Sequence, residues 1–460
     1  INKTETAVLW KTGKMWFRVP ETVKIVLKNR LPEGVFAKDL ALWIKGILSK
    51  LDVNGLAIEY HGEGVASLSI DDRMTIANIS TEMGVVSSAF PPDDRLADYF
   101  NEPAVRGVWA DEEAVYSRFI EIDLANVFPM VYDTGNNVLQ GVEELVGLKI
   151  QQGLIGACAS GRLEDLRLVS MILEGKHIAN GFQLFVVPAS RDIYLRAVEE
   201  GIIDKIAQSG AMVLGSSCGP CLGVGRVASV GNSRFISTAN SQYIGGTNHS
   251  GVEKYIASPA TVAMTALRGE LTPMIHFEGT QYKYNIPRVE PVVLGEYDYR
   301  KSNGVWNYGD IDNISSNQIF SEKLTCRLTL EQVEEIKPYL FKGLDPNFTC
   351  DVKPGDIIIA GENFGCGQLV KHAATGLVAV GVKLVIAKSV NRDFYRMAIN
   401  HGLRILVDWA VVDAYTSGEQ LTIDDENHLL YLNERAYKLP YVDAEFQKIL
   451  EKGGLVNAFS

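Results

Sequence analysis

Three cysteines occupy positions from which their thiolates could meet. Cys218 and Cys221 form a CxxC in the turn SSCGPCLG, and Cys158 lies in a second turn, IGACASGR. Each turn follows an apolar run typical of a β-strand, and parallel strands deliver the residues that follow them to one edge of a sheet. Three thiolates without an evident fourth suit a [4Fe–4S] cluster with one iron left open. An open iron is a Lewis acid that can promote the loss of a substrate hydroxyl.

The same spacing is compatible with other chemistry. A CxxC can be a redox dithiol, and isolated cysteines are most often small buried hydrophobic residues. The pair can also be half of a zinc site, although no second CxxC and no HxxxH accompanies it. With six cysteines in 460 residues, the chain does not suggest a disulfide framework. We therefore expect a reducing compartment, with the cytoplasm as the default.

The elements that carry these residues alternate between strand and helix. Residues 20–47 read as a strand, a turn and an amphipathic helix. Residues 148–217 read as strand, helix (163–174), strand, helix (193–208) and strand. Residues 356–390 give a strand, a Gly-rich turn, a helix and a strand, the pattern of a parallel crossover. This alternation predicts an α/β fold.

Changes in composition divide the chain, whose length calls for several domains. We expect residues 1–133 to form the remainder of an N-terminal α/β domain and residues 134–276 to form an α/β domain that carries the cysteines. Residues 277–303 have the Pro, Gly and charge content of a linker, and residues 304–460 form the last domain. The chain lacks an initiator Met and opens within a helical pattern, so we expect a fragment or a processed product.

The overall charge and the apolar content argue against some kinds of binding partner. The formal net charge is −12, which argues against nucleic acid because phosphate binding needs a basic face. No apolar run approaches the ~18–20 residues that cross a bilayer. The first residues also lack the apolar core of a secretory signal. These features predict a protein that binds neither nucleic acid nor membrane; its oligomeric state is left open.

The chain as a whole resembles the aconitase superfamily, which includes 3-isopropylmalate dehydratase and homoaconitase. The motifs that carry the resemblance are YHGEGVASLSIDDRMTIANISTEMG, GACASGRLEDLR, GSSCGPCLGVG, STANSQYIGG, GLDPNFTCDVKPGDIIIAGENFGCG and GVKLVIAKSVNRDFYRMAINHGL. The resemblance implies three-layer αβα cluster domains followed by a swivelling β/α domain, with the family's large- and small-subunit regions fused. The family's upstream stretch with its His and Asp residues is absent.

The resemblance also implies roles for individual residues. It implies a [4Fe–4S] cluster with one non-cysteinyl iron, held by Cys158, Cys218 and Cys221. Asn78 and Glu82 match the N-x-x-x-E pair of the family's cluster-facing helix, where four-residue spacing puts both on one face. In family terms Glu82 handles the proton on the departing hydroxyl and Asn78 helps to hold the site. Asn240 aligns with the Asn that opens a segment close to the cluster.

The segment after Asn240 departs from the family pattern. The family supplies two arginines there, whereas this chain has Ser241 and Gly246, with Gln242 between them. Arginine forks bind carboxylates bidentately, and neither serine nor glycine can replace them.

The last domain departs as well. Where the family has GSSREHA, with a serine base and a carboxylate-binding arginine, this chain has GQLVKHA. The replacements at the Ser-Ser-Arg positions are Gln368, Leu369 and Val370. Lys371 and His372 remain as nearby titratable groups, and Ser315, Ser316 and Asn317 replace the family's D-T-D segment.

Together these features favour a [4Fe–4S]-dependent hydro-lyase whose partner is a small hydroxy acid. Each lost charge-assisted contact is worth roughly 1.5–3 kcal/mol, so a standard tricarboxylate is not the expected substrate. One alternative is a non-catalytic iron–sulfur paralogue with a sensor or regulatory role. The other is an ordinary 3-isopropylmalate or homoaconitate dehydratase, which requires the departures to be harmless.

Overall fold

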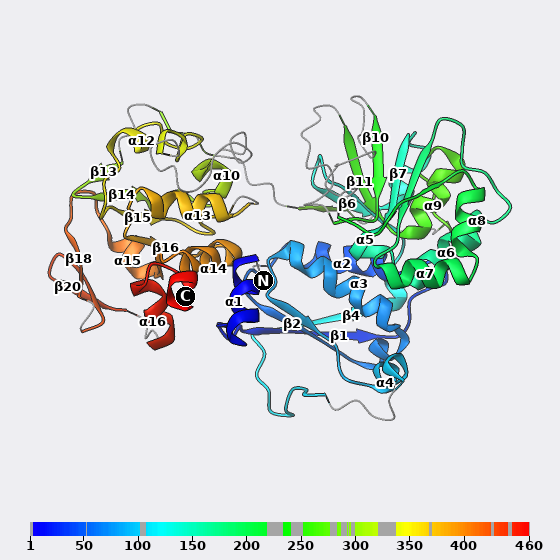
Figure 1. The fold of residues 1–460 in the computed structure, drawn as a ribbon, viewed down its shortest axis with the longest axis horizontal. Coiled ribbons are helices and arrows are strands. Elements are labelled where there is room, and N and C mark those ends of the chain that lie inside the picture. The colour runs from blue at the N-terminus through cyan, green and yellow to red at the C-terminus, as the bar shows by residue number, and fades with distance from the viewer. Residues whose placement is uncertain are drawn as a thin grey trace. The chain divides into compact units, whose positions relative to one another are not determined.

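The chain folds into two compact units, shown in Figure 1. The computed structural model describes residues 3–51, 53–101, 107–218, 233–240, 252–276, 283–286, 292, 294–295, 300–320, 337–367, 370–424, 427–439 and 444–459. One unit comprises residues 20–288, and the other comprises residues 1–19 together with 289–460. Each unit has its own sheets and core, and each is described by itself.

The first half of unit 20–288 is a parallel sheet. In spatial order its strands are β3 (Ser87–Ala89), β2 (Ala57–His61), β1 (Thr22–Lys28) and β4 (Arg118–Asp123). Every second residue of β1, TVKIVLK, is buried, so its alternating sequence fits a strand with one face in the core. The connections carry the helices α2 (Ala37–Leu48), α3 (Ile70–Ser80) and α4 (Asp94–Phe100). The strand and helix expected over 20–47 are therefore confirmed.

The second half of this unit is a mixed sheet. Its order is β12 (Lys283–Asn285), β6 (Val138–Gly141), β5 (Met130–Asp133), β11 (Glu253–Ala257), β10 (Arg234–Ser237), β7 (Gln152–Gly156), β8 (Gln183–Val187) and β9 (Met212–Val213). From β11 to β9 neighbouring strands are parallel, whereas β5, β6 and β12 pair antiparallel. The helices here are α5 (Ala157–Ser160), α6 (Leu163–Leu173), α7 (Arg191–Glu199), α8 (Ile202–Gln208) and α9 (Pro259–Arg268).

One expected helix of this half is wrong in detail. The sequence predicts a single helix over 193–208, but the structure has α7 and α8 with a break between them. Gly201 at the break has φ of +70°, a left-handed conformation that ends α7 and that glycine adopts without steric cost.

The helix α2 joins the cores of the two sheets. It contacts α3 on one side and β5 of the mixed sheet on another, and all its residues except Ile47 are buried. Side chains from both sheets belong to the same hydrophobic cluster as α2. A helix with apolar neighbours all round has no solvent-facing stripe for its charged residues.

The other unit is built on a sheet of five strands. They are, in order, β13 (Lys301–Ser302), β14 (Val305–Tyr308), β15 (Ile357–Ala360), β16 (Leu384–Ala387) and β17 (Arg404–Val407). All pairs except β13–β14 are parallel. A small antiparallel sheet adds β18 (Leu421–Asp424), β19 (Leu429–Leu432) and β20 (Arg435–Lys438). Its helices include α10 (Ser316–Ile319), α12 (Phe348–Asp351), α13 (Val370–Ala379), α14 (Arg392–Asn400), α15 (Trp409–Ala414), α16 (Ala444–Glu451) and α17 (Leu455–Phe459).

These elements confirm the crossover expected over 356–390, which is β15–α13–β16 with parallel strands. The α/β fold class is likewise confirmed in both units. Among the helices that the structure describes, none combines the length and the apolar content needed to span a bilayer.

The first helix of the chain, α1 (Lys3–Thr12), belongs to the unit that contains the C-terminus. Its Glu5 is buried and forms an ion pair with Arg396 of α14. Asn400 donates its Nδ2–H to Glu5 Oε1 at 2.5 Å, and Trp16 Nε1 donates to Asn400 Oδ1 at 3.0 Å. This contact-based division differs from the expected domain of residues 1–133; the expected boundaries at 133, 276 and 303 stay predictions.

Candidate active site

Two buried lysines lie on one face of α2. The exposed fraction of Lys38 is 1% and that of Lys45 is 6%. They are seven residues apart, which is about two helical turns, so their side chains point to the same side. Burying an ammonium group costs several kcal/mol unless an anion or an acceptor offsets it. Lys45 has such a partner, whereas the ammonium group of Lys38 has no hydrogen-bond acceptor among the described residues.

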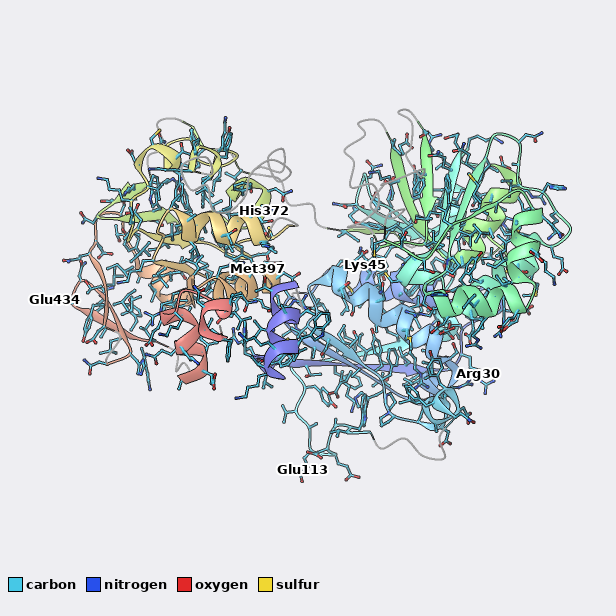
Figure 2. All side chains as sticks on the ribbon, viewed as in Figure 1. Arg30, Lys45, Glu113, His372, Met397 and Glu434 are labelled. Atoms are coloured by element: carbon cyan, nitrogen blue, oxygen red, sulfur yellow. The ribbon has the colours of Figure 1, made fainter. Side chains whose placement is uncertain are left out.

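Lys45 holds the carboxylate of Glu82. Glu82 lies in the short 3₁₀ helix η2 (Thr81–Met83) that directly follows α3. Lys45 Nζ donates to Glu82 Oε2, and the two side chains are only 8% and 2% exposed. The same nitrogen lies 4.4 Å from the centroid of the Tyr132 ring, on β5. Figure 2 labels Lys45 on α2. A charge-assisted bond between two buried groups fixes the orientation of the Glu82 carboxylate.

An asparagine pair lies one turn away from Glu82. Asn78 on α3 is four residues before Glu82, and its Oδ1 accepts a hydrogen bond of 2.8 Å from Asn240 Nδ2. Asn240 follows β10 and is 5% exposed, and its Oδ1 finds no donor among the described residues. Buried amide oxygens are rarely left without a donor, so this acceptor is available to a ligand. The structure thus brings Asn78 and Asn240 into direct contact, with Glu82 one helical turn after Asn78, and the roles assigned to the three residues stay predictions.

Cys158 lies in a tight turn at the carboxyl end of β7. The turn contains two consecutive residues with left-handed backbone, Gly156 at φ +121° and Ala157 at φ +55°. Gly156 N–H donates to Thr238 Oγ1 at 2.9 Å, which joins this turn to the segment that carries Asn240. Cys158 is a free, exposed cysteine. Strained backbone of this kind is common where a functional side chain must be aimed.

Gly156→Ala is expected to destabilise the protein more than an ordinary loss of glycine does. The added Cβ would lie 2.0 Å from the carbonyl oxygen of Val187, so β7 and β8 would have to separate. We expect a loss of about 3 kcal/mol or more in the free energy of unfolding, measured in urea. Gly175→Ala is the control, because Gly175 has φ of +67° but no atom within 4 Å of the added Cβ. The control should lose only about 1–2 kcal/mol. Equal losses in the two variants would show that the close approach at Gly156 is unimportant.

The other two candidate ligands of the cluster are Cys218 and Cys221, and the structure describes the first of them. Cys218 follows β9 and is a free, exposed cysteine. The strands β7, β8 and β9 are neighbours and parallel, so Cys158 and Cys218 both follow carboxyl ends of strands in this sheet. Cys221 lies outside the described residues. In the part of the chain that the structure describes, no three His, Cys, Asp or Glu side chains come together as a metal-binding group.

Charges on several sides act on Lys38. Burial and, to a lesser extent, the positive charge of Lys45 lower the pKa of Lys38 to about 8, while Glu82, Asp165 and Cys158 oppose that decrease. Asp165 accepts a hydrogen bond from the backbone N–H of Arg162 at 3.1 Å, at the start of α6. Its own pKa is raised to about 7, chiefly by burial. Lys38 therefore lies within electrostatic range of Cys158 and keeps its charge in much of the population at neutral pH.

Five predicted site residues fall outside the described residues, and three lie in the other unit. Those outside are Cys221, Ser241, Gln242, Gln368 and Leu369. Val370, Lys371 and His372 form the first turn of α13 (Figure 2), in the unit of residues 1–19 and 289–460. The His372 ring stacks on Phe320 with centroids 5.6 Å apart, and burial together with Lys371 lowers its pKa. The roles assigned to these eight residues stay predictions.

The sequence reasoning missed Lys38 and Lys45. Their signal was present in the helix AKDLALWIKGIL, where two lysines two turns apart interrupt a run of large apolar residues. An amphipathic surface helix explains such a pattern equally well. Only the packing of α2 between two sheets shows that both ammonium groups are buried.

The residues around Cys158 fit an anionic metal–sulfur group. A [4Fe–4S] cluster held by three thiolates carries net negative charge and presents sulfur atoms that accept hydrogen bonds. The structure offers two buried cationic donors without an acceptor among the described residues, Lys38 Nζ and Arg162 Nε. Arg162 is anchored at this turn, since its Nη2 donates to the carbonyl oxygen of Cys158 at 3.2 Å. An unused amide acceptor, Asn240 Oδ1, suits a hydroxyl group nearby.

Two protein families match the chain. Residues 1–143 and 134–269 match the aconitase family (aconitate hydratase), and residues 306–407 match the aconitase C-terminal domain. The matches cover most of both units, including the segments that carry Cys158, Glu82 and Asn240.

Curated relatives carry names from the same family. The 3-isopropylmalate dehydratase large subunit 1 of Methanopyrus kandleri is 38% identical over 277 residues, covering 59% of this chain and 66% of the relative. The 3-isopropylmalate dehydratase large subunit 2 of Archaeoglobus fulgidus is 38% identical over 275 residues, covering 58% of this chain and 66% of the relative. The mitochondrial homoaconitase of Debaryomyces hansenii is 29% identical over 519 residues, covering 99% of this chain and 74% of the relative. The chain thus spans about two thirds to three quarters of the length of these relatives.

Proposed function

Because the chain belongs to the aconitase family, we propose that it is a [4Fe–4S]-dependent hydro-lyase acting on a small hydroxy acid that is not a tricarboxylate. The observation that carries this proposal is the group of polar side chains formed by the buried Lys45–Glu82 pair and the Asn78–Asn240 pair, together with the exposed Cys158 on α5, a helix that contacts α3. These side chains come from four separate segments of unit 20–288. Hydrophobic packing alone gives no reason to bury them together, since buried charges and amides cost free energy.

The cysteines would hold the cluster and leave one of its irons without a protein thiolate. Cys158, Cys218 and Cys221 are the proposed ligands. When bound, such a cluster supplies an iron that acts as a Lewis acid on a substrate hydroxyl. Lys38 and Arg162 would offset the negative charge of these thiolates, since each has a buried nitrogen without an acceptor among the described residues and Arg162 donates to the carbonyl oxygen of Cys158.

Glu82 is the proposed acid–base group for the hydroxyl. A carboxylate that is 2% exposed can exchange a proton with a bound hydroxyl or water without competition from bulk solvent. Lys45 fixes the carboxylate by donating to one of its oxygens, Oε2. Asn240, held by its bond to Asn78, presents an amide oxygen that accepts no hydrogen bond from the described residues and could accept one from a substrate hydroxyl.

The substituted positions support a substrate with fewer carboxylates. Ser241 and Gly246 stand where the family places arginines, and Val370 stands where the family places a carboxylate-binding arginine. None of these can form a charged, bidentate contact. Gln368, at the position of the family's serine base, has no group that accepts a proton near neutral pH. A hydroxy acid with one carboxylate needs fewer of these contacts, and Lys371 or His372 is the nearest alternative acceptor in sequence.

The experiment is an anaerobic assay of the full chain after reconstitution with iron and sulfide. Growth of absorbance from an unsaturated product is followed for citrate, 2-isopropylmalate and a panel of monocarboxylic hydroxy acids. We expect turnover only within the panel, reduced about 100- to 10,000-fold in Glu82→Gln. Turnover of citrate or isopropylmalate at a typical enzymatic rate of ~10 s⁻¹ would instead identify an ordinary family isomerase.

A second function is favoured by one specific observation, the replacement of the serine base by Gln368. A chain that keeps the cluster cysteines but lacks that base fits a non-catalytic iron–sulfur paralogue with a sensor or regulatory role. The same assay separates the two proposals. A protein with an intact cluster and no turnover on any hydroxy acid would support the paralogue.

A further inference from the structure

The ammonium group of Lys38 forms no hydrogen bond with any described residue. Its Nζ is buried, and the exposed fraction of the whole residue is 1%. A buried ammonium without a partner is among the most costly features that a fold can retain. Replacing it by an apolar side chain of similar length would relieve that cost. Its presence is therefore best explained by an anion that the described side chains do not provide.

The carboxylates that act on Lys38 already have partners of their own. Glu82 is paired with Lys45, and Asp165 accepts the backbone N–H of Arg162 at the start of α6. Cys158 is the remaining group that acts electrostatically on Lys38, and it is a free cysteine whose neighbour Ala157 packs in the same hydrophobic cluster as α2. A cluster held by Cys158 would therefore bring negative charge within electrostatic range of Lys38.

We propose that Lys38 is a positioning residue for the cluster and acts through its buried positive charge. This charge offsets the negative charge of the sulfides and of the thiolate ligands, among them Cys158, and raises the reduction potential of the cluster. This inference rests on the proposed cluster function and adds to it a residue that sets the reduction potential of the cluster. A nearby fixed cation stabilises the reduced state, which carries one more negative charge, more than it stabilises the oxidised state. Charge, hydrogen bonds to sulfur and burial are the features that set cluster potentials.

The variant that isolates this effect is Lys38→Met. Methionine keeps the length of the side chain and removes the charge, and no hydrogen bond to a described residue is lost. The cluster-free protein should therefore unfold at the same temperature as the unsubstituted protein, or at a higher one. Lys38→Arg is the companion variant, because it keeps the positive charge. Lys50→Met is the matched control: Lys50 lies two residues after α2 and is exposed, so its charge is screened by solvent.

The measurement is the midpoint potential of the reconstituted cluster, followed by electron paramagnetic resonance during a dithionite titration. In Lys38→Met we expect the reduction equilibrium to fall at least tenfold, which is a shift of about 59 mV to lower potential for one electron. Lys38→Arg and Lys50→Met should stay close to the unsubstituted protein.

The outcomes distinguish this inference from the proposed function. A cluster that forms in every variant with the same potential would overturn the role of Lys38 and leave the lyase proposal intact. Failure of the unsubstituted protein to bind a cluster would overturn both. If Lys38→Met does not fold, a potential in Lys38→Arg equal to that of the unsubstituted protein supports the charge, and loss of the cluster in Lys38→Arg contradicts it.

Discussion

Cys158→Ser protein, prepared without oxygen and supplied with iron and sulfide, is expected to hold no iron–sulfur cluster. The thiolate of Cys158 is one of three proposed ligands, and serine oxygen is a poor substitute for a soft sulfur ligand. Cys158 is exposed at the end of β7, where iron can reach it, and is a free cysteine. Absorbance near 400 nm, together with iron and sulfide content, measures the loss. Cys218→Ser and Cys221→Ser should behave in the same way.

Two cysteines of the other unit are the controls for this prediction. Cys366 is partly buried, and burial raises its pKa to about 11, so it stays a thiol and cannot act as a ready metal ligand. Its Sγ donates to the carbonyl oxygen of Asn313 at 3.4 Å. Cys350 is exposed and lies on α12. Cys350→Ser and Cys366→Ser should retain the full cluster. Retention of the cluster in Cys158→Ser would contradict the ligand assignment.

Lys45→Met is expected to be the most destabilising charge substitution in unit 20–288. It leaves the carboxylate of Glu82, which is 2% exposed, buried without its ion partner. Breaking a buried pair in this way costs about 3–5 kcal/mol in the free energy of unfolding. The double variant Lys45→Met with Glu82→Gln removes both charges and should recover much of that loss. Urea unfolding of the two single variants and the double variant gives the coupling energy directly.

A surface pair supplies the comparison for Lys45. Lys28 and Glu121 lie 2.7 Å apart on β1 and β4, with side chains 44% and 48% exposed. Solvent screens such a pair, so Lys28→Met should cost no more than about 1 kcal/mol. If Lys45→Met is as mild as Lys28→Met, the buried pair contributes neither stability nor a fixed orientation to Glu82.

The elements that follow short-range patterns were predictable from the sequence. The strand and helix over 20–47 and the crossover over 356–390 form as expected, because burial there follows the period of each element. The family resemblance, carried by segments such as GACASGRLEDLR, is confirmed by the family matches. The break at Gly201 was missed because a glycine within a helical pattern does not show whether its φ is positive.

Features that depend on packing between distant segments were not predictable. The lysines of α2 read as exposed charges, and only the contacts of α2 with α3 and with β5 bury them. The docking of α1 on α14 through Glu5 joins residues almost 400 positions apart. A local pattern contains no information about such a partner. The contact between Asn78 and Asn240 could be anticipated from the sequence, because the resemblance assigned both residues to one site.

Metal and sulfide analysis of the unsubstituted chain, purified without oxygen, tests the central claim most directly. The account predicts about four iron and about four sulfide ions per chain, with conversion to a three-iron form in air because one iron has no cysteine ligand. Stoichiometric zinc with no iron would contradict it, since the cysteines would then form a closed zinc site without an iron to activate a hydroxyl.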